Sequence, residues 1–284
     1  MVETPIAGVF NGLGGTRLYF EEWSPERRPE AALVFAHGAN NHCSLDAIQR
    51  LGAAARQAGL VFYAYDARGF GRSEGRPMHI DSFAQPRGDL AALLRLVRKR
   101  QPATPVFLAG CSYGALTALD QAIVSPHLMA GVIAMSFSTV GLSGSTAVAV
   151  KLISALGALF PKLTVPAQPA ESFAGARRWL GATGRLWADP LCPATNTLGF
   201  VREVLARRGP QLAQQLPLLR VPLLYQAGAL DDVAPPDPGL TARTGSPDAT
   251  YRCYPDSGHD LLAEPDHPAV TADLLAWISE RTSR

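Results

Sequence analysis

Short apolar runs alternate with segments of helical periodicity along most of the chain. One helical segment carries Leu90, Leu93, Leu94 and Val97, whose i, i+3, i+4, i+7 spacing places them on one helix face. Strands that alternate with helices predict βαβ units, and therefore a mostly parallel sheet covered by helices on both faces. The apolar runs expected to form its buried strands are 31–36, 60–65, 105–109, 131–135, 221–227 and 250–254.

The pattern is different near the start of the chain. Asn11-Gly12 and Gly14-Gly15 are turn signals that precede a further strand-like run at 18–23. They predict a hairpin, which would add antiparallel strands at one edge of the sheet.

The alternation also stops between residues 138 and 219. Strand signals there are weak, and several prolines separate the helical fragments 149–160, 174–186 and 198–207. We expect this segment to be a helical insertion over the sheet, while residues 1–137 and 220–284 form one α/β core.

The composition excludes several classes of protein. With 26 Lys and Arg against 24 Asp and Glu in 284 residues, the formal net charge is +2, whereas a dedicated nucleic-acid binder usually has a strong basic excess. The four cysteines contain no Cys-x-x-Cys pair, so we expect free thiols in a reducing compartment. No apolar stretch reaches the roughly 18 residues of a membrane span, and no signal peptide is recognisable. These observations predict a cytoplasmic protein without a nucleic-acid partner.

The pattern Gly-x-Ser-x-Gly occurs twice, at 71–75 and at 110–114. A nucleophile elbow with this pattern needs a strand directly before it and a helix directly after it, so that the serine oxygen is pushed outward. Only the second copy has this context, and Ser112 is therefore the predicted nucleophile. The first copy is flanked by loop residues, so Ser73 is expected to be a coincidental match.

A serine hydroxyl is a weak nucleophile unless a base takes its proton. Asp231 and His259 follow the last two predicted strands, and the carboxyl ends of parallel strands meet at one edge of the sheet. We therefore expect His259 to act as the base for Ser112, with Asp231 orienting its ring. Asp232 and His267 are expected to have structural roles.

The oxyanion of an acyl-transfer reaction needs two preorganised backbone donors. One is expected to be the N–H of Tyr113, directly after the nucleophile, and the other the N–H of Ala39 in the loop after the strand 31–36. Gly38 would allow this loop to approach closely. The His37 ring is expected to brace the loop, and the Cys111 side chain to pack away from the site.

The sequence lacks the motifs of several other chemistries. It contains no Walker A loop, no His-Glu-x-x-His and no EF-hand loop, so we expect neither a cofactor nor a metal ion. A carboxylate nucleophile would need Asp at position 112, where this chain has Ser.

Together these motifs resemble those of α/β-hydrolase-fold serine hydrolases of the monoacylglycerol lipase and lysophospholipase type. The resemblance extends from about Gly15 to Ile278. It implies a catalytic triad of Ser112, Asp231 and His259, oxyanion donors at Ala39 and Tyr113, and a cap formed by residues 138–219. The motifs that carry it are His37-Gly38-Ala39 with His42, the segments 66–75 and 110–114, Gly228-Ala229-Leu230-Asp231, and Gly258-His259.

The sequence also departs from the usual family pattern. The elbow reads Gly-Cys-Ser-Tyr-Gly-Ala instead of Gly-His-Ser-Met-Gly-Gly, so Ala115 replaces the last glycine. Asn40-Asn41 stands where Gly-Glu is common in the lipases. The cap is the least recognisable part, and caps determine the choice of substrate.

The predicted function is hydrolysis of a small-molecule acyl ester, such as a monoacylglycerol or a lysophospholipid, through an acyl-enzyme. Hydrolysis of an amide, a thioester or a carbon–carbon bond by the same triad is an alternative. A catalytically silent hydrolase fold that serves as a binding protein is a second one. The apolar cap residues 147–160 would form an acyl pocket or a surface that contacts lipid; simple packing of the cap on the core would explain them equally well.

Overall fold

The computed structural model describes residues 4–140, 144–166 and 189–282, so the helix expected at 174–186 lies outside the described residues. One eight-stranded sheet has the order β1-β2-β4-β3-β5-β6-β9-β10. The strands from β4 to β10 in this order are parallel, and β1 and β2 at one edge are antiparallel. Their bounds are β1 Ile6–Asn11, β2 Arg17–Trp23, β3 Ala31–Ala36, β4 Leu60–Tyr65, β5 Val106–Cys111, β6 Gly131–Met135, β9 Leu223–Gly228 and β10 Ala249–Tyr254.

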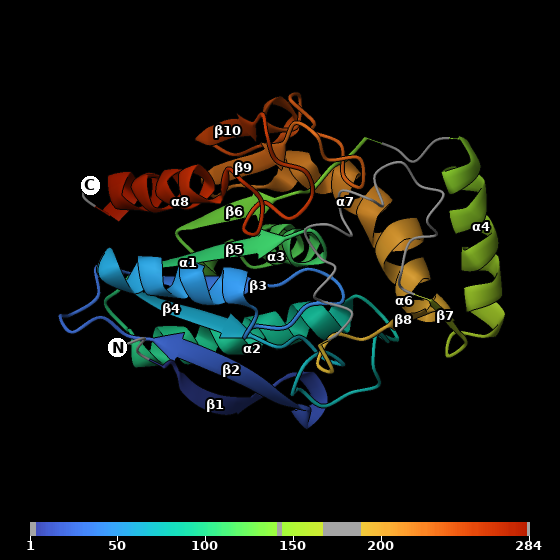
Figure 1. The fold of residues 1–284 in the computed structure, drawn as a ribbon, viewed down its shortest axis with the longest axis horizontal. Helices are drawn as coiled ribbons and strands as arrows, with labels where there is room; N and C mark the ends of the chain where they lie inside the picture. Colours follow the sequence, from blue (N-terminus) through green and yellow to red (C-terminus); the bar gives the residue numbers. More distant parts are fainter. Residues whose placement is uncertain (1–3, 141–143, 167–188, 283–284) are drawn as a thin grey trace.

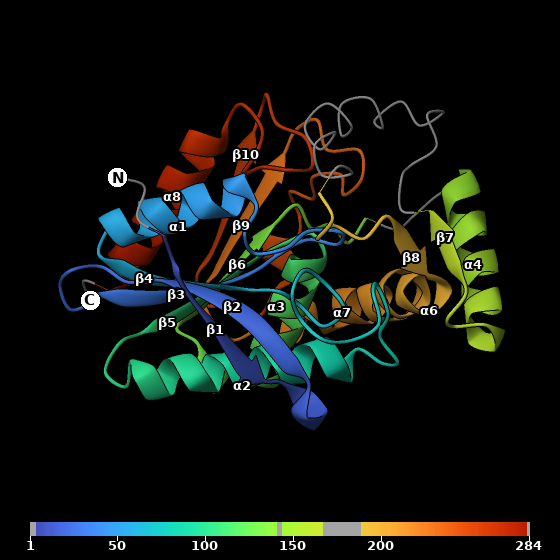
Figure 2. The same ribbon diagram turned by 60° about the horizontal axis from the view of Figure 1, so that its bottom comes forward.

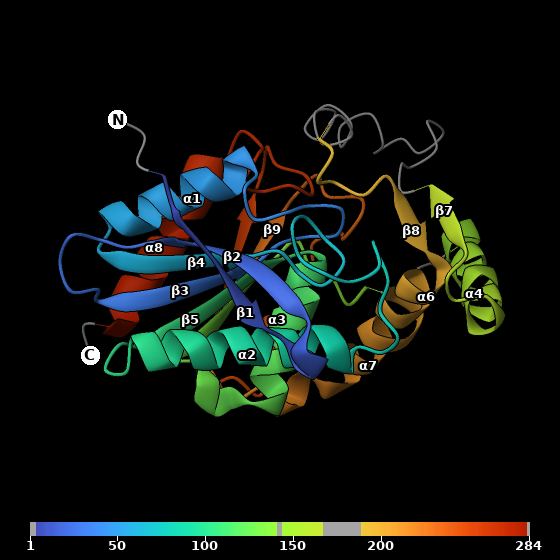
Figure 3. The same cartoon turned by 90° about the horizontal axis from the view of Figure 1, so that it is seen from below.

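Helices cover both faces of this sheet. Figure 3 shows α1 (Asp46–Gln57) and α8 (His267–Thr282) on one side, and α2 (Ala84–Arg100) and α3 (Tyr113–Val124) on the other. Every residue of β3 is buried, because its side chains alternate between two apolar clusters, one under each helical layer. The predicted α/β-hydrolase fold is confirmed.

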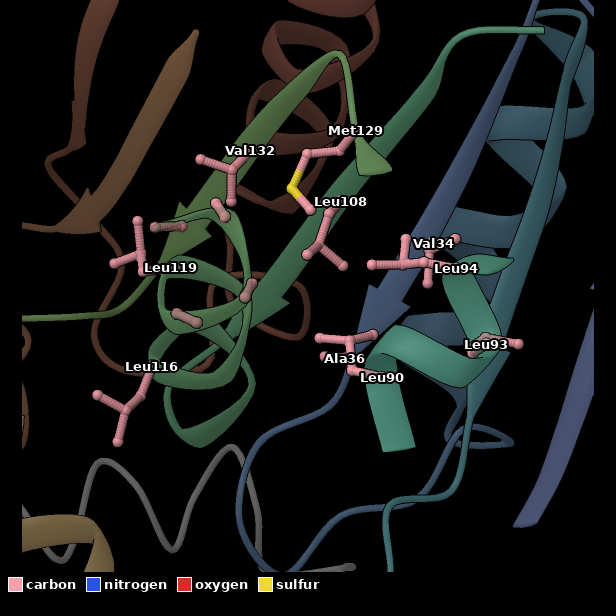
Figure 4. Packing of buried hydrophobic residues seen from close by; sticks show 14 of the residues in the cluster. Val34, Ala36, Leu90, Leu93, Leu94, Leu108, Leu116, Leu119, Met129 and Val132 are labelled. Atoms are coloured by element: carbon pink, nitrogen blue, oxygen red, sulfur yellow. The ribbon is translucent and has the colours of Figure 1, made fainter. Parts of the chain in front are cut away.

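The leucines of α2 lie on its buried face, as their spacing predicted. Leu90, Leu93 and Leu94 are fully buried, and Figure 4 shows Leu90 beside Ala36 and Leu94 beside Val34 of β3. Fully burying a leucine contributes roughly 1.5–3 kcal/mol, so this face holds the helix against the sheet.

The N-terminal hairpin is also confirmed. β1 pairs antiparallel with β2, and the register brings Asn11 opposite Arg17. Gly14 and Gly15 in the turn have φ angles of 71° and 79°, a left-handed conformation that glycine adopts without a steric penalty.

The segment between β6 and β9, called the insertion below, leaves the sheet and returns to it. β6 and β9 pair directly, with Val132 opposite Leu223. Figures 1 and 2 show the elements of the insertion mostly beyond one end of the sheet, with the last of its helices running back beside α3. They are α4 (Gly144–Leu159), β7 (Thr164–Pro166), β8 (Thr195–Thr197), α6 (Leu198–Val201), a π-helical segment (Arg202–Arg208) and α7 (Gly209–Gln215).

Two features of the insertion differ from the prediction. β7 and β8 form a small antiparallel sheet that was not predicted. Each strand has three residues, which is too short for a periodic pattern to show in the sequence. The helix expected at 198–207 continues to Gln215 through the π-helical segment. This wider turn ends just before Pro210, whose ring would clash with the carbonyl group four residues earlier in an α-helix.

The four cysteines are free thiols, three of them buried and Cys253 exposed, in agreement with the expectation from their spacing. Among the residues that the structure describes, none of the helices has both the length and the apolar character needed to cross a membrane.

Candidate active site

Ser112 occupies a sharp turn between β5 and α3. β5 ends at Cys111 and α3 begins at Tyr113, so a single residue joins strand to helix. Its φ of 54° and ψ of −115° are strained for a non-glycine residue, at a cost of about 1–3 kcal/mol. The Ser112 N–H donates to the Met135 carbonyl at 2.9 Å, and its own carbonyl accepts from Leu116 at 3.0 Å. These bonds hold the hydroxyl at the carboxyl edge of the sheet.

The two glycines of the elbow are required by close backbone contacts. A Cβ on Gly110 would overlap the carbonyl of Gly114, and a Cβ on Gly114 would overlap the carbonyl of Ala36. Glycine at both positions therefore lets α3 begin against the end of β3. This is the physical reason for the small residues that the pattern contains.

The other Gly-x-Ser-x-Gly copy lies in a loop. The Ser73 hydroxyl donates to the Asp66 carbonyl at 2.5 Å and accepts from the Tyr19 N–H at 2.9 Å. Ser73 therefore ties the loop to β2, as expected of a structural residue.

Three loops bring Ser112, His259 and Asp231 into one hydrogen-bonded row. His259 Nε2 lies 3.0 Å from Ser112 Oγ, and His259 Nδ1 lies 2.9 Å from Asp231 Oδ2. The other Asp231 oxygen accepts from the backbone N–H groups of Val233 and Ala234, at 2.9 and 2.8 Å. With one oxygen fixed by the backbone, the carboxylate holds the imidazole through the other.

The loops that carry Asp231 and His259 are held against each other by their backbones. A Cβ on Gly228 would overlap the carbonyl groups of Ser257 and Gly258. The Leu230 N–H also donates to the Ser257 carbonyl at 3.0 Å. This contact, between the end of β9 and the loop after β10, determines how closely the Asp231 carboxylate and the His259 imidazole approach.

The electrostatics of His259 suit a general base. Burial lowers the pKa of an imidazole, but the hydrogen bond and charge of Asp231, together with the charges of Asp260 and Asp232, outweigh burial and raise the pKa of His259. In the neutral ring, Nδ1–H donates to Asp231, which leaves the Nε2 lone pair to accept the Ser112 hydroxyl proton.

The loop after β3 lies beside Ser112 and is braced by His37. His37 Nδ1 donates to the Gly38 carbonyl at 2.7 Å, and Nε2 accepts from the Ala67 N–H at 3.0 Å. In a trans peptide the carbonyl and the N–H point in opposite directions, so the Ala39 N–H points away from His37. The expected bracing role of His37 agrees with these bonds.

Gly38 is less constrained than predicted. A Cβ at this position would stand 3.6 Å from Ser112 Cβ and 3.5 Å from the Cys111 carbonyl, which are ordinary contacts. The loop therefore approaches the nucleophile without needing glycine there. Tyr113, the other expected donor, is the first residue of α3, where backbone N–H groups have no partner within the helix.

The remaining sequence candidates have structural surroundings. Cys111 is buried in the cluster under α1 and α8, and burial, followed by the charge of Asp260, raises the pKa of its thiol. Asp232 is exposed to solvent. His267 bonds through Nδ1 to the Glu264 carbonyl, at the start of α8.

Sequence reasoning missed a cluster that includes His42 of the loop after β3. His42 Nε2 lies 2.9 Å from Asp189 Oδ2, and one donor atom each of His42, Asp189 and Cys192 lie within 4.8 Å of one another. Because His42 and Asp189 are 147 residues apart, no local pattern could have joined them.

Comparison with known proteins identifies the family. The family model described as serine aminopeptidase, S33, matches residues 27–266. The chain belongs to this family of hydrolases. The monoacylglycerol lipase of Mycolicibacterium smegmatis is 27% identical over 273 residues, which cover 95% of each chain. The monoglyceride lipase of Homo sapiens is 28% identical over 278 residues, which cover 95% of this chain and 89% of the human protein.

A solved structure shares the fold. A soluble variant of the monoglyceride lipase from Saccharomyces cerevisiae, in complex with a substrate analog, superposes with a TM-score of 0.80 at 17% identity, covering 98% of this chain and 96% of that one. The predicted membership in the monoacylglycerol lipase-like α/β hydrolases is confirmed. The expected enzyme class, a carboxylic-ester hydrolase, is confirmed by this family and these relatives.

Proposed function

We propose that this serine hydrolase cleaves small-molecule carboxylic esters through an acyl-enzyme on Ser112. The observation that carries the proposal is the position of His259, whose two ring nitrogens lie 3.0 Å from Ser112 Oγ and 2.9 Å from Asp231 Oδ2. A base that reaches the nucleophile on one side and an orienting carboxylate on the other is the arrangement that activates a serine.

The reaction follows from these contacts. Ser112 Oγ attacks the acyl carbonyl while its proton moves to His259 Nε2, and Asp231 stabilises the resulting imidazolium. The N–H groups of Ala39 and Tyr113 bind the oxyanion of the tetrahedral intermediate. His259 then protonates the departing alcohol, leaving the acyl group on Ser112. Water attacks this ester, His259 takes its proton, and the same proton returns to Ser112 Oγ as the acid leaves.

We propose a monoacyl ester with an apolar chain, such as a monoacylglycerol, as the substrate. The relatives with the names monoacylglycerol lipase and monoglyceride lipase support this choice. The ring of Tyr113, the residue that follows Ser112 in the chain, packs against Phe70 and Phe200, with centroid separations of 5.9 and 5.1 Å. Such an aromatic group favours an apolar acyl chain over a charged one.

Phe200 comes from the insertion, whereas Tyr113 and Phe70 belong to the core. We therefore propose that residues 138–219 form a cap over the site and that residues 1–137 and 220–284 form the hydrolase core. A cap that packs an aromatic ring against Tyr113, the residue after Ser112, would take part in the choice of acyl chain.

We further propose that the outer face of α4 contacts lipid. Val148, Leu152, Leu156 and Leu159 recur at helical spacing and are 57, 63, 50 and 74% exposed. Packing of the cap on the core would have buried them. Lys151 lies on the same helix and is exposed, and a basic residue beside an apolar face suits an anionic membrane surface.

Co-sedimentation with vesicles of phosphatidylcholine and phosphatidylglycerol tests this surface. The double variant Leu152→Ser/Leu156→Ser is expected to lose most of the vesicle-bound fraction. The control Leu13→Ser removes a leucine that is 47% exposed in the N-terminal hairpin, and is expected to bind like the wild type. Equal binding by all three proteins would contradict the proposal.

Turnover of p-nitrophenyl esters of graded chain length tests the proposed function. Ser112→Ala is expected to lower kcat/KM on the order of 10³-fold or more, whereas Ser73→Ala is expected to retain most of it. Equal rates for Ser112→Ala and the wild type would contradict the assignment.

An amide substrate is the second candidate, because the family model is described as serine aminopeptidase. The same row of side chains could cleave a p-nitroanilide, and a higher kcat/KM for the anilide than for the matched ester would favour it. A thioester or carbon–carbon bond substrate would be detected by the same leaving-group series. A catalytically silent binding protein would leave Ser112 unlabelled by a fluorophosphonate.

Residence in the cytoplasm stays a prediction based on the free thiols.

A further inference from the structure

The loop after β3 is bonded to the residues of the insertion that directly precede β8. Asn40 Nδ2 donates to the Pro193 carbonyl at 2.8 Å, and His42 bonds to Asp189 at 2.9 Å. The side chains of Asn40 and His42 come from the same loop as Ala39, and both residues are buried. The neighbour of the proposed oxyanion donor is thus attached directly to the insertion.

Asn40 adopts an unusual backbone conformation to make this bond. Its φ is 61°, in the left-handed region that asparagine tolerates better than most residues other than glycine. A strained position of this kind persists only where the surroundings hold it. Here the partly buried bond to Pro193 on one side and the His37–Gly38 bond on the other enclose Ala39.

The proton on His42 can be assigned from its partners. His42 Nδ1 accepts from the Ser44 N–H at 3.2 Å, so the neutral ring carries its proton on Nε2 and donates it to Asp189. The other Asp189 oxygen accepts from the Leu191 N–H at 2.9 Å. Burial raises the pKa of Asp189, but these two hydrogen bonds, together with electrostatic attraction to His42 and Arg72, outweigh burial and lower it. The carboxylate is therefore an ionised acceptor on both oxygens.

This assignment disfavours a metal site at His42, Asp189 and Cys192, although their donor atoms lie within 4.8 Å of one another. A metal ion needs the lone pair of Nε2, with the proton on Nδ1 directed at an acceptor. Here Nδ1 faces an N–H donor instead, so metal binding would place two protons against each other.

We propose that Asn40 and His42 are positioning residues that fasten residues 189–193 of the insertion to the oxyanion loop, so that the placement of the Ala39 N–H depends on the seating of the insertion. This inference rests on the proposed function. Loss of an oxyanion donor costs 10²–10³-fold in kcat, and a donor that is only loosened is expected to cost about 5–10-fold. The effect belongs in kcat, because the donor acts on the developing oxyanion and not on the bound ester.

The variant Asn40→Gly tests this with little disturbance to the fold. Glycine keeps the left-handed backbone without strain and deletes only the bond to Pro193. The matched control is Arg76→Ala, because Arg76 also donates to a carbonyl of the insertion, that of Lys162 at 3.1 Å, but does so away from the oxyanion loop. Both variants are expected to unfold at the wild-type urea midpoint.

The substrate for the test is p-nitrophenyl acetate, whose acyl group is too small to depend on a seated cap. Asn40→Gly is expected to lower its kcat about 5–10-fold with KM unchanged, while Arg76→Ala stays within about twofold. If Asn40→Gly hydrolysed the acetate with the wild-type kcat, the proposal would be overturned. This would hold even if KM for long-chain esters rose, because the Asn40–Pro193 bond would then position only the cap and not the Ala39 N–H. Stoichiometric binding of Zn²⁺ that Cys192→Ser abolishes would also overturn it. If wild type and Ser112→Ala turned over the acetate equally, the proposed function itself would fail.

Discussion

The backbone carbonyl of Ala36 occupies the place where a Cβ on Gly114 would stand. Ala36 is the last residue of β3 and Gly114 is the second residue of α3, so this contact joins the start of the loop after β3 to the helix that follows Ser112. The separation of Ser112 from the loop that carries Ala39 is thus determined by a backbone contact. A side chain can change its rotamer to make room, whereas the backbones of Ala36 and Gly114 can separate only if β3 or α3 moves.

Gly114→Ala is therefore expected to destabilise the fold by more than about 2 kcal/mol, since overpacking of a rigid contact costs roughly 1–3 kcal/mol and here backbone must move. Gly38→Ala is the control, because its added Cβ meets only ordinary contacts, at 3.5 Å or more. Its unfolding free energy is expected to stay within about 1 kcal/mol of the wild type. Urea unfolding measures both, and equal stability of the two variants would contradict the account of the elbow.

The rate of ester hydrolysis is expected to depend on the protonation of His259. Only the neutral ring can accept the Ser112 proton, and the pKa of His259 is raised above its ordinary value of about 6.5. As the pH falls, kcat/KM should therefore begin to decrease above pH 6.5. Asp231→Asn removes the main group that raises this pKa, so the decrease should move to lower pH and the plateau should fall by roughly 10³–10⁴-fold. An unshifted profile in Asp231→Asn would argue against the assigned pair.

The same pair predicts how stability changes with pH. Because the pKa of His259 is raised in the folded state, the protonated ring stabilises the fold below the unfolded pKa of about 6.5. This contribution disappears as the pH rises through the folded pKa. The difference in unfolding free energy between wild type and Asp231→Asn should consequently be larger at pH 5.5 than at pH 9. A difference that grows with pH would have the wrong sign.

Asp120 on α3 is expected to be critical for attaching the insertion. It is fully buried and pairs with Arg208 of the π-helical segment, which is itself buried. Removal of one partner leaves an uncompensated buried charge, so Asp120→Asn should cost about 3 kcal/mol. Arg87→Gln breaks a longer contact to Asp120, at 3.4 Å from a partly exposed side chain, and should cost less than about 1 kcal/mol. Equal urea midpoints for Asp120→Asn and Arg87→Gln would contradict this expectation, because breaking the buried pair would then cost no more than breaking the partly exposed one.

The parts of the fold that the sequence predicts well are those determined by local periodicity. The fully apolar runs of β3 and β4 and the leucine face of α2 each show their burial in a few consecutive residues. The elbow at Ser112 is equally local, because strand, glycines and helix are adjacent in the chain. Asp231 and His259 could be placed because each follows a strand of the same parallel sheet.

The contacts that escaped prediction join residues far apart in the chain. Thr164 pairs with Thr197 across the insertion, and Asn40 reaches Pro193 over 153 residues. Neither contact produces a periodic pattern in the sequence. Asn40-Asn41 was visible as a departure from the usual Gly-Glu, yet its meaning depends on a partner that only the folded chain supplies.

The central claim is that Ser112 is the nucleophile that His259 activates. Intact-mass and peptide-level mass spectrometry after brief exposure to a fluorophosphonate tests it most directly, since the reagent phosphonylates only an activated serine. The account predicts one adduct per chain on Ser112, none in Ser112→Ala, and strongly slowed labelling in His259→Ala. Labelling at Ser73, or equally fast labelling of Ser112 without His259, would contradict it.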